Sequence, residues 1–449
     1  MTAAPASRSL LLALLPSTAA YAWRLDPRHS HDRMKLADYV HLVQTAERGL
    51  IDIFFLADSY GIREDRVGLA AMRGFSNVVT PDAFTLLSTL VTASRHIGLV
   101  ATASTTYNEP YHLARRLATL DHLSDGRAGW NVITSTIDAE ALNFGLDRQL
   151  SNEARYARAR ECLEVVRALW DSWDDDALVL DPATRCYFDE TRVHRLDHQG
   201  ANFRVRGPLN MPRPPQGHPL VCQAGASEAG WEFAAERADI MYGKAISLAE
   251  AQRFYREVKG RMGRHGRTPD QLKILPGLVA VVGRTEREAR DKFRAVQDCL
   301  TEAEGRSILT HLLPGIDLSG VGLDEPVPET PEIEQAARRF RIFLSRDGAR
   351  LTVRQAIDYA SAGIGHLTLI GTPEQVAGEM IRWVEAEGAD GFNLMPHILP
   401  QGLEDFVDLV VPALQERGAF KQAYADGTLR DKLGLPRPPG RDGAHGESR

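Results

Sequence analysis

The sequence predicts an α/β protein folded as a single (β/α)8 TIM barrel, and three observations support this prediction. Short apolar segments of strand length alternate with segments of helical periodicity along most of the 449 residues, and this alternation favours parallel strands. Eight segments have the composition of strands, which is the number that closes such a barrel. No Gly-x-Gly-x-x-Gly motif opens a helix, so a doubly wound dinucleotide-binding sheet is less well supported.

The predicted strands are short aliphatic runs bounded by glycine, proline or small polar residues. In chain order they span residues 19–24, 51–57, 97–102, 127–135, 219–226, 238–242, 274–282 and 391–396. The intervening segments repeat apolar residues every three or four positions, as in 35–49, which ends at Gly49 as many helices do. Pro110 and Gly126 suit the first turn and the C-terminal end of the helix before the fourth strand.

Two segments are too long to be ordinary barrel loops. The insertion 136–218, after the fourth strand, contains a long predicted helix over 152–173 and an alternating stretch, 181–206, that suggests a hairpin packed at the barrel's edge. The insertion 302–359, after the seventh strand, includes the Pro- and Gly-rich passage 314–331. Long loops of a barrel rise over its C-terminal face, so we expect the second insertion to be a lid or a substrate wall.

Composition and charge argue against several classes of protein. With 43% hydrophobic and 25% charged residues, the chain can bury a large core. We expect one domain over 1–435 and a flexible tail over 436–449. The net charge is -7, and the acidic and basic residues are interspersed, so that no broad basic face is expected. We therefore expect no nucleic-acid partner. Four widely scattered cysteines indicate neither a disulfide framework nor a metal site, and they suit a reducing compartment.

The N-terminus imitates a signal peptide, because an apolar run at 10–15 is followed by small residues at 18–22. Few strongly apolar residues precede Pro16, however, and cleavage there would remove material that the barrel needs. We therefore expect a cytoplasmic rather than an exported protein. No stretch approaches the ~20 apolar residues of a membrane span, so no membrane association is expected.

Two polar residues at predicted strand ends are candidate ligand contacts, because the active sites of barrels lie at the carboxyl ends of their strands. Asp58 directly follows the second strand. Its carboxylate either binds a ligand or caps the next element, and the sequence supports both alternatives equally. Thr102 ends the third strand, and its hydroxyl could bind a polar ring, although threonine is also an ordinary strand residue.

Two further candidates lie in helix N-termini, which favour anions. Tyr156 lies in the first turn of the long helix, where its ring could equally be a core aromatic. Ser227 ends a Gly-Ala-Ser sequence and directly precedes the next helix, and small residues let a phosphate approach the backbone, although a serine at this position is also a common helix cap without any ligand. Gly230, in place of the Glu of a capping box, would leave amides free for the phosphate, whereas Glu228 would repel it.

Several motifs together resemble one family. They lie in the family's order at 105–115, 129–135, 225–227, 371–377 and 390–396. They resemble the nitrilotriacetate monooxygenase-like family of FMN-dependent monooxygenases, within the bacterial luciferase-like superfamily, and the resemblance extends from about residue 21 to residue 420.

The resemblance implies a set of FMN-binding residues. It assigns flavin contacts to four residues already singled out, together with Asn152. The four are Asp58, Thr102, Tyr156 and Ser227. Relatives often have His at the position of Asn152, and asparagine can donate a hydrogen bond there but cannot bring positive charge. Relatives also tend to have His where this chain has Leu25.

The reaction that the resemblance implies is a two-component monooxygenation. Reduced FMN, supplied by a separate NAD(P)H:flavin reductase, would react with O2 to give a flavin hydroperoxide that oxygenates a small organic substrate. His311 in the expected lid and Tyr60 after the second strand are the candidate catalytic contacts. The resemblance further implies a homodimer or homotetramer. Two alternatives are a flavin- or deazaflavin-dependent barrel oxidoreductase without oxygen insertion and a non-catalytic flavin-binding protein.

Overall fold

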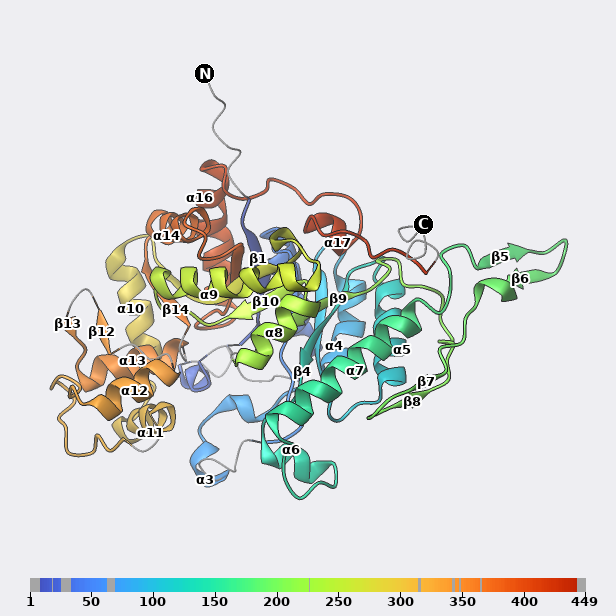
Figure 1. Cartoon of the computed structure of the whole chain (residues 1–449). Helices are drawn as coiled ribbons and strands as arrows, with labels where there is room; N and C mark the ends of the chain where they lie inside the picture. The colour runs from blue at the N-terminus through green and yellow to red at the C-terminus, as the bar shows by residue number, and fades with distance from the viewer. Residues whose placement is uncertain are drawn as a thin grey trace.

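A closed parallel barrel forms the body of the protein (Figure 1). The structure is a computed structural model that describes residues 9–441 apart from 18, 26–33, 63–68, 226, 314–315, 341–343, 347–348 and 364–365. The order around the barrel is β1 (Leu11–Leu14), β2 (Ile53–Leu56), β3 (Gly98–Ser104), β4 (Ala128–Ile133), β9 (Leu220–Gln223), β10 (Ile240–Gly243), β11 (Lys273–Val282), β15 (Gly391–Leu394) and back to β1. The predicted TIM barrel is therefore confirmed.

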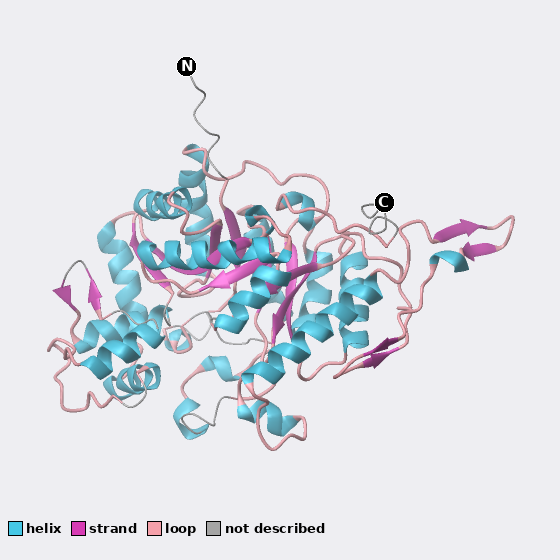
Figure 2. Ribbon diagram, in the orientation of Figure 1, coloured by secondary structure: helices cyan, strands magenta, loops and turns pink. Residues whose placement is uncertain are grey.

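Helices follow the strands and cover the outside of the barrel (Figure 2). Their apolar faces pack on the outward-facing residues of the strands, such as Leu12 and Leu14 of β1. In chain order the main covering helices are α1 (Leu36–Arg48), α4 (Ala83–Leu90), α5 (Pro110–Leu123), α7 (Asn152–Trp170), α8 (Glu228–Arg237), α9 (Leu248–Arg261), α10 (Glu286–Gln297), α14 (Pro373–Glu385), α15 (Gln401–Asp405) and α16 (Val411–Glu416).

The first strand lies earlier in the chain than the sequence predicts. The signal-peptide-like run forms β1, which pairs with β2 and β15, and Leu12 and Leu14 are fully buried. The predicted strand 19–24 is wrong, because its second half is the 3-10 helix Ala22–Arg24. Tyr21 in this segment is buried for another reason, since it packs with Ala22 against Val296.

Inward-facing side chains divide the barrel interior into an apolar lower layer and a polar upper layer. Ala13, Ile53 and Val100 share the lower layer with Leu429 and other residues near the C-terminus, which close the N-terminal end. Leu429 is the first residue of the short helix α17 (Leu429–Lys432). Polar residues therefore remain for the C-terminal end of the barrel, where barrel enzymes bind their substrates.

The first insertion contains the short helix α6 (Asp138–Asn143), the long helix α7 and two hairpins. The hairpins are β5 (Leu178–Asp181) with β6 (Cys186–Phe188), and β7 (His198–Gln199) with β8 (Arg204–Val205). The prediction of one hairpin packed at the barrel's edge is wrong for the first of them, which projects from the body in Figure 1. Its Leu180 and Tyr187 are 58% and 67% exposed.

The second insertion forms a helical cluster with a hydrophobic core of its own, beside the barrel in Figure 1. Its helices are α11 (Glu302–Leu312), α12 (Pro331–Phe340) and α13 (Val353–Gly363), with the short strands β12 (Ser345–Arg346) and β13 (Ala349–Arg350). A strand that the sequence analysis missed, β14 (Leu367–Gly371), follows the cluster and pairs with the second half of β11. The function of the cluster as a lid remains a prediction.

The helical cluster is tied to the segment that follows β1. The Arg24 guanidinium donates to both carboxylate oxygens of Glu304, at 2.7 and 2.6 Å. The Tyr21 hydroxyl donates to Gln297 Oε1 at 3.0 Å, and the same oxygen accepts from the Ser361 hydroxyl at 2.8 Å. These contacts hold the second insertion next to the exit of the first strand.

Candidate active site

Asp58 follows β2 at the C-terminal end of the barrel and already accepts two backbone hydrogen bonds. Its Oδ1 accepts from the Ser59 amide at 2.7 Å, and its Oδ2 accepts from the amide of Ala83, the first residue of α4, at 3.2 Å. The capping alternative is thus present, and it does not exclude ligand contact because the side chain is only half-buried. Burial raises the pKa of Asp58 to about 6.

Thr102 lies inside the barrel next to a carboxamide that the sequence analysis did not single out. Its Oγ1 accepts from Asn131 Nδ2 at 3.0 Å, since the two residues are paired across β3 and β4. In the described part of the chain, Oδ1 of Asn131 is buried without a hydrogen-bond partner, and so is Oδ1 of Asn393 on β15. Such orphaned acceptors are costly unless a ligand or water donates to them.

Tyr156 is both a core aromatic and a polar contact, so the two alternatives from the sequence are compatible. Its ring packs in the cluster between α7 and the barrel, and its hydroxyl accepts from Gln223 Nε2 at 3.4 Å. A Cβ atom on Gly225 or on Gly230 would come within 2.9 or 2.8 Å of this hydroxyl oxygen. Both glycines are therefore needed to leave room for the Tyr156 hydroxyl.

Ser227 begins α8, and its own side chain uses one of the helix amides. The Ser227 hydroxyl accepts from the Gly230 amide at 3.2 Å, so the expectation that this amide stays free is wrong. Glu228, which was expected to repel a phosphate, is paired with Arg261 at 2.5 Å and has a 75% exposed side chain. The charge of Glu228 is thus balanced by Arg261, and Ser227 itself is exposed.

Asn152 is the first residue of α7 and lies beside a buried arginine that the sequence analysis missed. Its Oδ1 accepts from Arg155 Nη2 at 3.2 Å. The Arg155 side chain also donates to Thr134 at the end of β4, at 3.0 Å. No motif could have identified Arg155, because α7 contains several other arginines at helical spacing.

Tyr60 follows Asp58 and is held by polar and aromatic contacts. Its hydroxyl accepts from Asn108 Nδ2 at 3.0 Å. Its ring meets those of Tyr107 and Phe144 edge-on, and these two rings stack on one another with centroids 4.5 Å apart. The three rings form an aromatic wall that starts at Tyr60, two residues after Asp58, and could exclude water from a bound ligand.

Glu140 of α6 is a second carboxylate near Asp58, and no sequence pattern pointed to it. Its Oε1 accepts from the Tyr60 amide at 3.1 Å and from the Ser59 hydroxyl at 3.2 Å. The residue is 2% exposed, and its Oε2 has no hydrogen-bond partner in the described part of the chain. The negative charge of Glu140 also contributes to raising the pKa of Asp58.

The remaining predicted residue, His311, lies in the last turn of α11. Its side chain is outside the described part of the structure, so no contact can be assigned to it. Leu25, where relatives tend to have histidine, is 43% exposed at the end of the 3-10 helix after β1.

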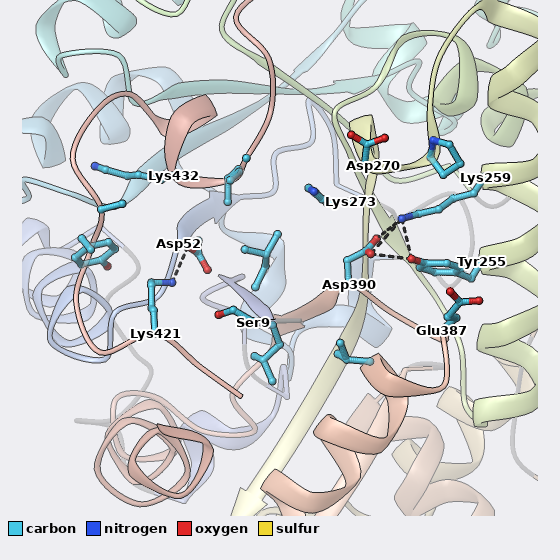
Figure 3. A pocket seen from close by; sticks show the side chains of 18 of the residues that line it. Ser9, Asp52, Tyr255, Lys259, Asp270, Lys273, Glu387, Asp390, Lys421 and Lys432 are labelled. Carbon is cyan, nitrogen blue, oxygen red and sulfur yellow. Dashed lines mark hydrogen bonds and ion pairs between the residues drawn. The ribbon is translucent and has the colours of Figure 1, made fainter. Parts of the chain in front are cut away.

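A cavity of about 880 Å³ opens at the other end of the barrel (Figure 3). Two of its carboxylates, Asp52 and Asp390, are already paired with protein groups. Asp390 accepts from Lys259 Nζ, from the Tyr255 hydroxyl and from a backbone amide of β11, and Asp52 accepts from Lys421 Nζ at 2.7 Å. These pairs fix strand ends and the C-terminal segment, so we assign the cavity to the stability of the barrel rather than to its chemistry.

Metal and membrane sites are not found in the part of the chain that the structure describes. No group of three or more His, Cys, Asp or Glu residues there could hold a metal ion. None of the helices searched is long and apolar enough to cross a bilayer.

A flavin fits the residues gathered at the C-terminal end of the barrel. The buried amide oxygens of Asn131 and Asn393 could accept from the N–H groups of a polar ring. The absence of Cβ atoms at Gly225 and Gly230 makes room for the Tyr156 hydroxyl near Ser227, the exposed residue that caps α8. The site provides amide oxygens as acceptors for a ring and the hydroxyls of Tyr156 and Ser227 for a phosphate.

Comparisons with known proteins identify the family. Residues 19–390 match the family described as luciferase-like monooxygenase. The chain is 45% identical over 425 residues to nitrilotriacetate monooxygenase component A of Aminobacter aminovorans, covering 93% of each chain. It is 43% identical over 424 residues to N-acetyl-S-(2-succino)cysteine monooxygenase of Bacillus subtilis, covering 94% of each.

A solved structure gives the same result. The crystal structure of DmoA from Hyphomicrobium sulfonivorans matches with a TM-score of 0.85 and 33% identity, covering 95% of this chain and 92% of that one. The resemblance inferred from the sequence motifs is thus confirmed, and the chain belongs to the luciferase-like monooxygenase family of flavin-dependent oxidoreductases.

Proposed function

We propose that this chain is the oxygenating component of a two-component monooxygenase that uses reduced FMN and O2 to oxygenate a small organic substrate. Family membership supports a flavin and a monooxygenase reaction. The observation that carries the proposal for FMN is the pair of glycines that face the Tyr156 hydroxyl beside the N-terminus of α8. Such an arrangement suits the phosphate of a mononucleotide.

The residues of this chain would hold and shield the cofactor. Tyr156 and Ser227 would bind the phosphate, whereas Thr102 and Asp58 would contact the ring, and Asn152 would be a further flavin contact. When bound, the reduced flavin supplies the electrons that activate O2. Asp58 can retain a proton up to about pH 6 next to the ring, because its pKa is raised by burial.

Exclusion of water from the bound flavin is the second task of the protein. The aromatic wall of Tyr60, Tyr107 and Phe144 supports this assignment, because it adds apolar surface beside Asp58. We propose that Tyr60 contacts the substrate and that the second insertion acts as a lid, with His311 as a further substrate contact. The contacts between Arg24, after β1, and Glu304, in the second insertion, would couple the position of the lid to the barrel.

A separate NAD(P)H:flavin reductase would supply the reduced FMN. The name of one relative, component A, describes part of a multi-component system. The chain also lacks the glycine-rich fingerprint of a dinucleotide-binding helix. We further propose a homodimer or homotetramer in the cytoplasm, which agrees with four cysteines that are all free.

Isotope labelling tests the function directly. The purified chain would be supplied with FMN, a flavin reductase, NADH and 18O2, with nitrilotriacetate and S-succinylated thiols as first substrates. One labelled oxygen atom in the product would support a monooxygenase. Oxidation of substrate without labelled product would favour an oxidoreductase that inserts no oxygen, and flavin binding without any product would favour a non-catalytic flavin-binding protein.

A further inference from the structure

Arg155 is a buried cation whose hydrogen bonds go to uncharged groups. The residue is 9% exposed and lies in the first turn of α7. Its Nε donates to the Leu150 carbonyl at 3.1 Å, and its Nη1 donates to the Thr134 hydroxyl at 3.0 Å and to the Ser135 carbonyl. Its Nη2 donates to Asn152 Oδ1 at 3.2 Å. Within the described residues, no carboxylate forms an ion pair with it.

A buried charge without a counter-ion is unfavourable, because burial removes its hydration and hydrogen bonds to uncharged groups replace only part of the lost energy. The N-terminus of α7 adds further positive potential at the same place. Both effects favour a negatively charged or electron-rich ligand near Arg155. The adjacent Tyr156 hydroxyl, proposed above as a phosphate contact, lies on the next residue of the same helix turn.

The contact with Arg155 also fixes which way the Asn152 carboxamide points. A guanidinium has only donors, so the atom of Asn152 that faces Arg155 must be the carbonyl oxygen. The amide Nδ2 must then face away from Arg155. In the described part of the structure, this Nδ2 group makes no hydrogen bond, although it lies at the end of the barrel that holds the candidate ligand residues.

We propose that Arg155 is a positioning residue that fixes the Asn152 carboxamide, so that Asn152 Nδ2 donates a hydrogen bond to an oxygen atom of the bound FMN. The Arg155 charge then replaces the positive charge that asparagine itself cannot provide. This inference rests on the proposed function, because it takes FMN as the ligand.

Two substitutions at Asn152 separate a ligand contact from a structural role. Asn152→Asp keeps the acceptor for Arg155, and makes that contact an ion pair, but removes the donor. Asn152→Ala removes both groups without adding charge. We would measure FMN binding by fluorescence titration and thermal unfolding of the flavin-free protein. Glu164→Gln, on the exposed face of α7, is the matched control.

The expected results run in opposite directions for binding and stability. Asn152→Asp should unfold at the same or a higher temperature than the wild type, because the new carboxylate pairs with Arg155 near a helix N-terminus. It should nevertheless bind FMN at least about tenfold more weakly. Asn152→Ala should lose about fivefold to tenfold in affinity, as expected for one hydrogen bond.

Arg155 itself is tested by the coupling between the two residues. Arg155→Gln should weaken FMN binding, and the double variant Asn152→Ala/Arg155→Gln should be little weaker than either single variant, because both act through one hydrogen bond. Additive losses would show that Arg155 acts independently of Asn152 and would overturn its positioning role.

The other outcomes also decide the question. Wild-type affinity in both Asn152 variants would overturn the proposed contact while leaving the proposed function intact. A loss in Asn152→Asp alone would show only charge repulsion and would likewise overturn the donor role. If the wild type itself bound no FMN, the proposed function would fail and the inference would fail with it.

Discussion

Replacing Gly225 by alanine should displace the Tyr156 hydroxyl and weaken FMN binding. A Cβ atom at this position would lie 2.7 Å from Gln223 Nε2, 2.9 Å from the Tyr156 hydroxyl oxygen and 3.0 Å from Gly230 Cα. The last contact is with backbone of α8, which cannot move without shifting the helix. The Tyr156 and Gln223 side chains must therefore move instead.

The magnitude follows from the interaction that is lost. A hydrogen bond from a tyrosine hydroxyl to a charged phosphate contributes about 1.5–3 kcal/mol, so Gly225→Ala should weaken FMN binding by roughly tenfold to a hundredfold. Crowding of a packed site should also lower the free energy of unfolding by about 1–3 kcal/mol. Tyr156→Phe should lose similar affinity with a smaller loss of stability, because its ring still packs in the core.

The assay is equilibrium titration with FMN, followed by fluorescence quenching, together with thermal unfolding of the flavin-free protein. Gly260→Ala is the matched control, because the residue lies in the last turn of α9 and no atom beyond its own stretch of that helix lies within 4 Å of the added Cβ. This control should keep wild-type affinity and be slightly more stable.

A double variant tests whether Gly225 acts through Tyr156. Gly225→Ala/Tyr156→Phe should bind FMN about as weakly as the more affected single variant, because the same hydroxyl is lost in each. Wild-type affinity in Gly225→Ala would refute the proposed position of the phosphate. Fully additive losses would show that Gly225 and Tyr156 contact the ligand separately.

Three further predictions follow from charges in the structure. The pKa of Asp58 is raised from 3.8 to about 6, so its ionisation should lower the free energy of unfolding as the pH rises between these values, by on the order of 1 kcal/mol after solvent screening. Urea unfolding measured against pH should show this loss in the wild type and not in Asp58→Asn. Identical pH profiles for the two proteins would contradict the assignment. Asp239→Asn should lower the free energy of unfolding by about 3–5 kcal/mol in the same assay, because it breaks a buried bidentate pair with Arg430 at the closed end of the barrel. A loss under about 1 kcal/mol would show that this ion pair does not stabilise the closed end. Ser227→Asp should weaken FMN binding by like-charge repulsion, and an unchanged dissociation constant would remove Ser227 from the phosphate site.

The barrel could be predicted because its buried parallel strands are short aliphatic runs separated by amphipathic helices. The first strand was misplaced because Pro16 divides two apolar segments, and only the pairing of β1 with β15 shows which of them enters the sheet. β14 was missed because its pairing with the extended half of β11 is a tertiary feature that leaves no periodic pattern. Edge pairings of this kind depend on the partner strand rather than on local composition.

The candidate site was predictable where chemistry follows a strand end, and not where it depends on distant contacts. Thr102 was identified from its position, but its partner Asn131 depends on the register between β3 and β4. Glu140 and Arg155 act through residues brought together by the fold. Ser227 shows the limit of local rules, since its hydroxyl caps the helix that was expected to leave an amide free.

The use of reduced FMN by this chain is tested by anaerobic titration of the purified protein with reduced and oxidised FMN, followed by admission of oxygen while absorbance is recorded. We expect saturable binding of reduced FMN and reoxidation of the bound flavin at a rate different from that of free flavin, because the site would shield it from water. Failure of both forms to bind would contradict the assignment of this chain as an FMN-dependent monooxygenase.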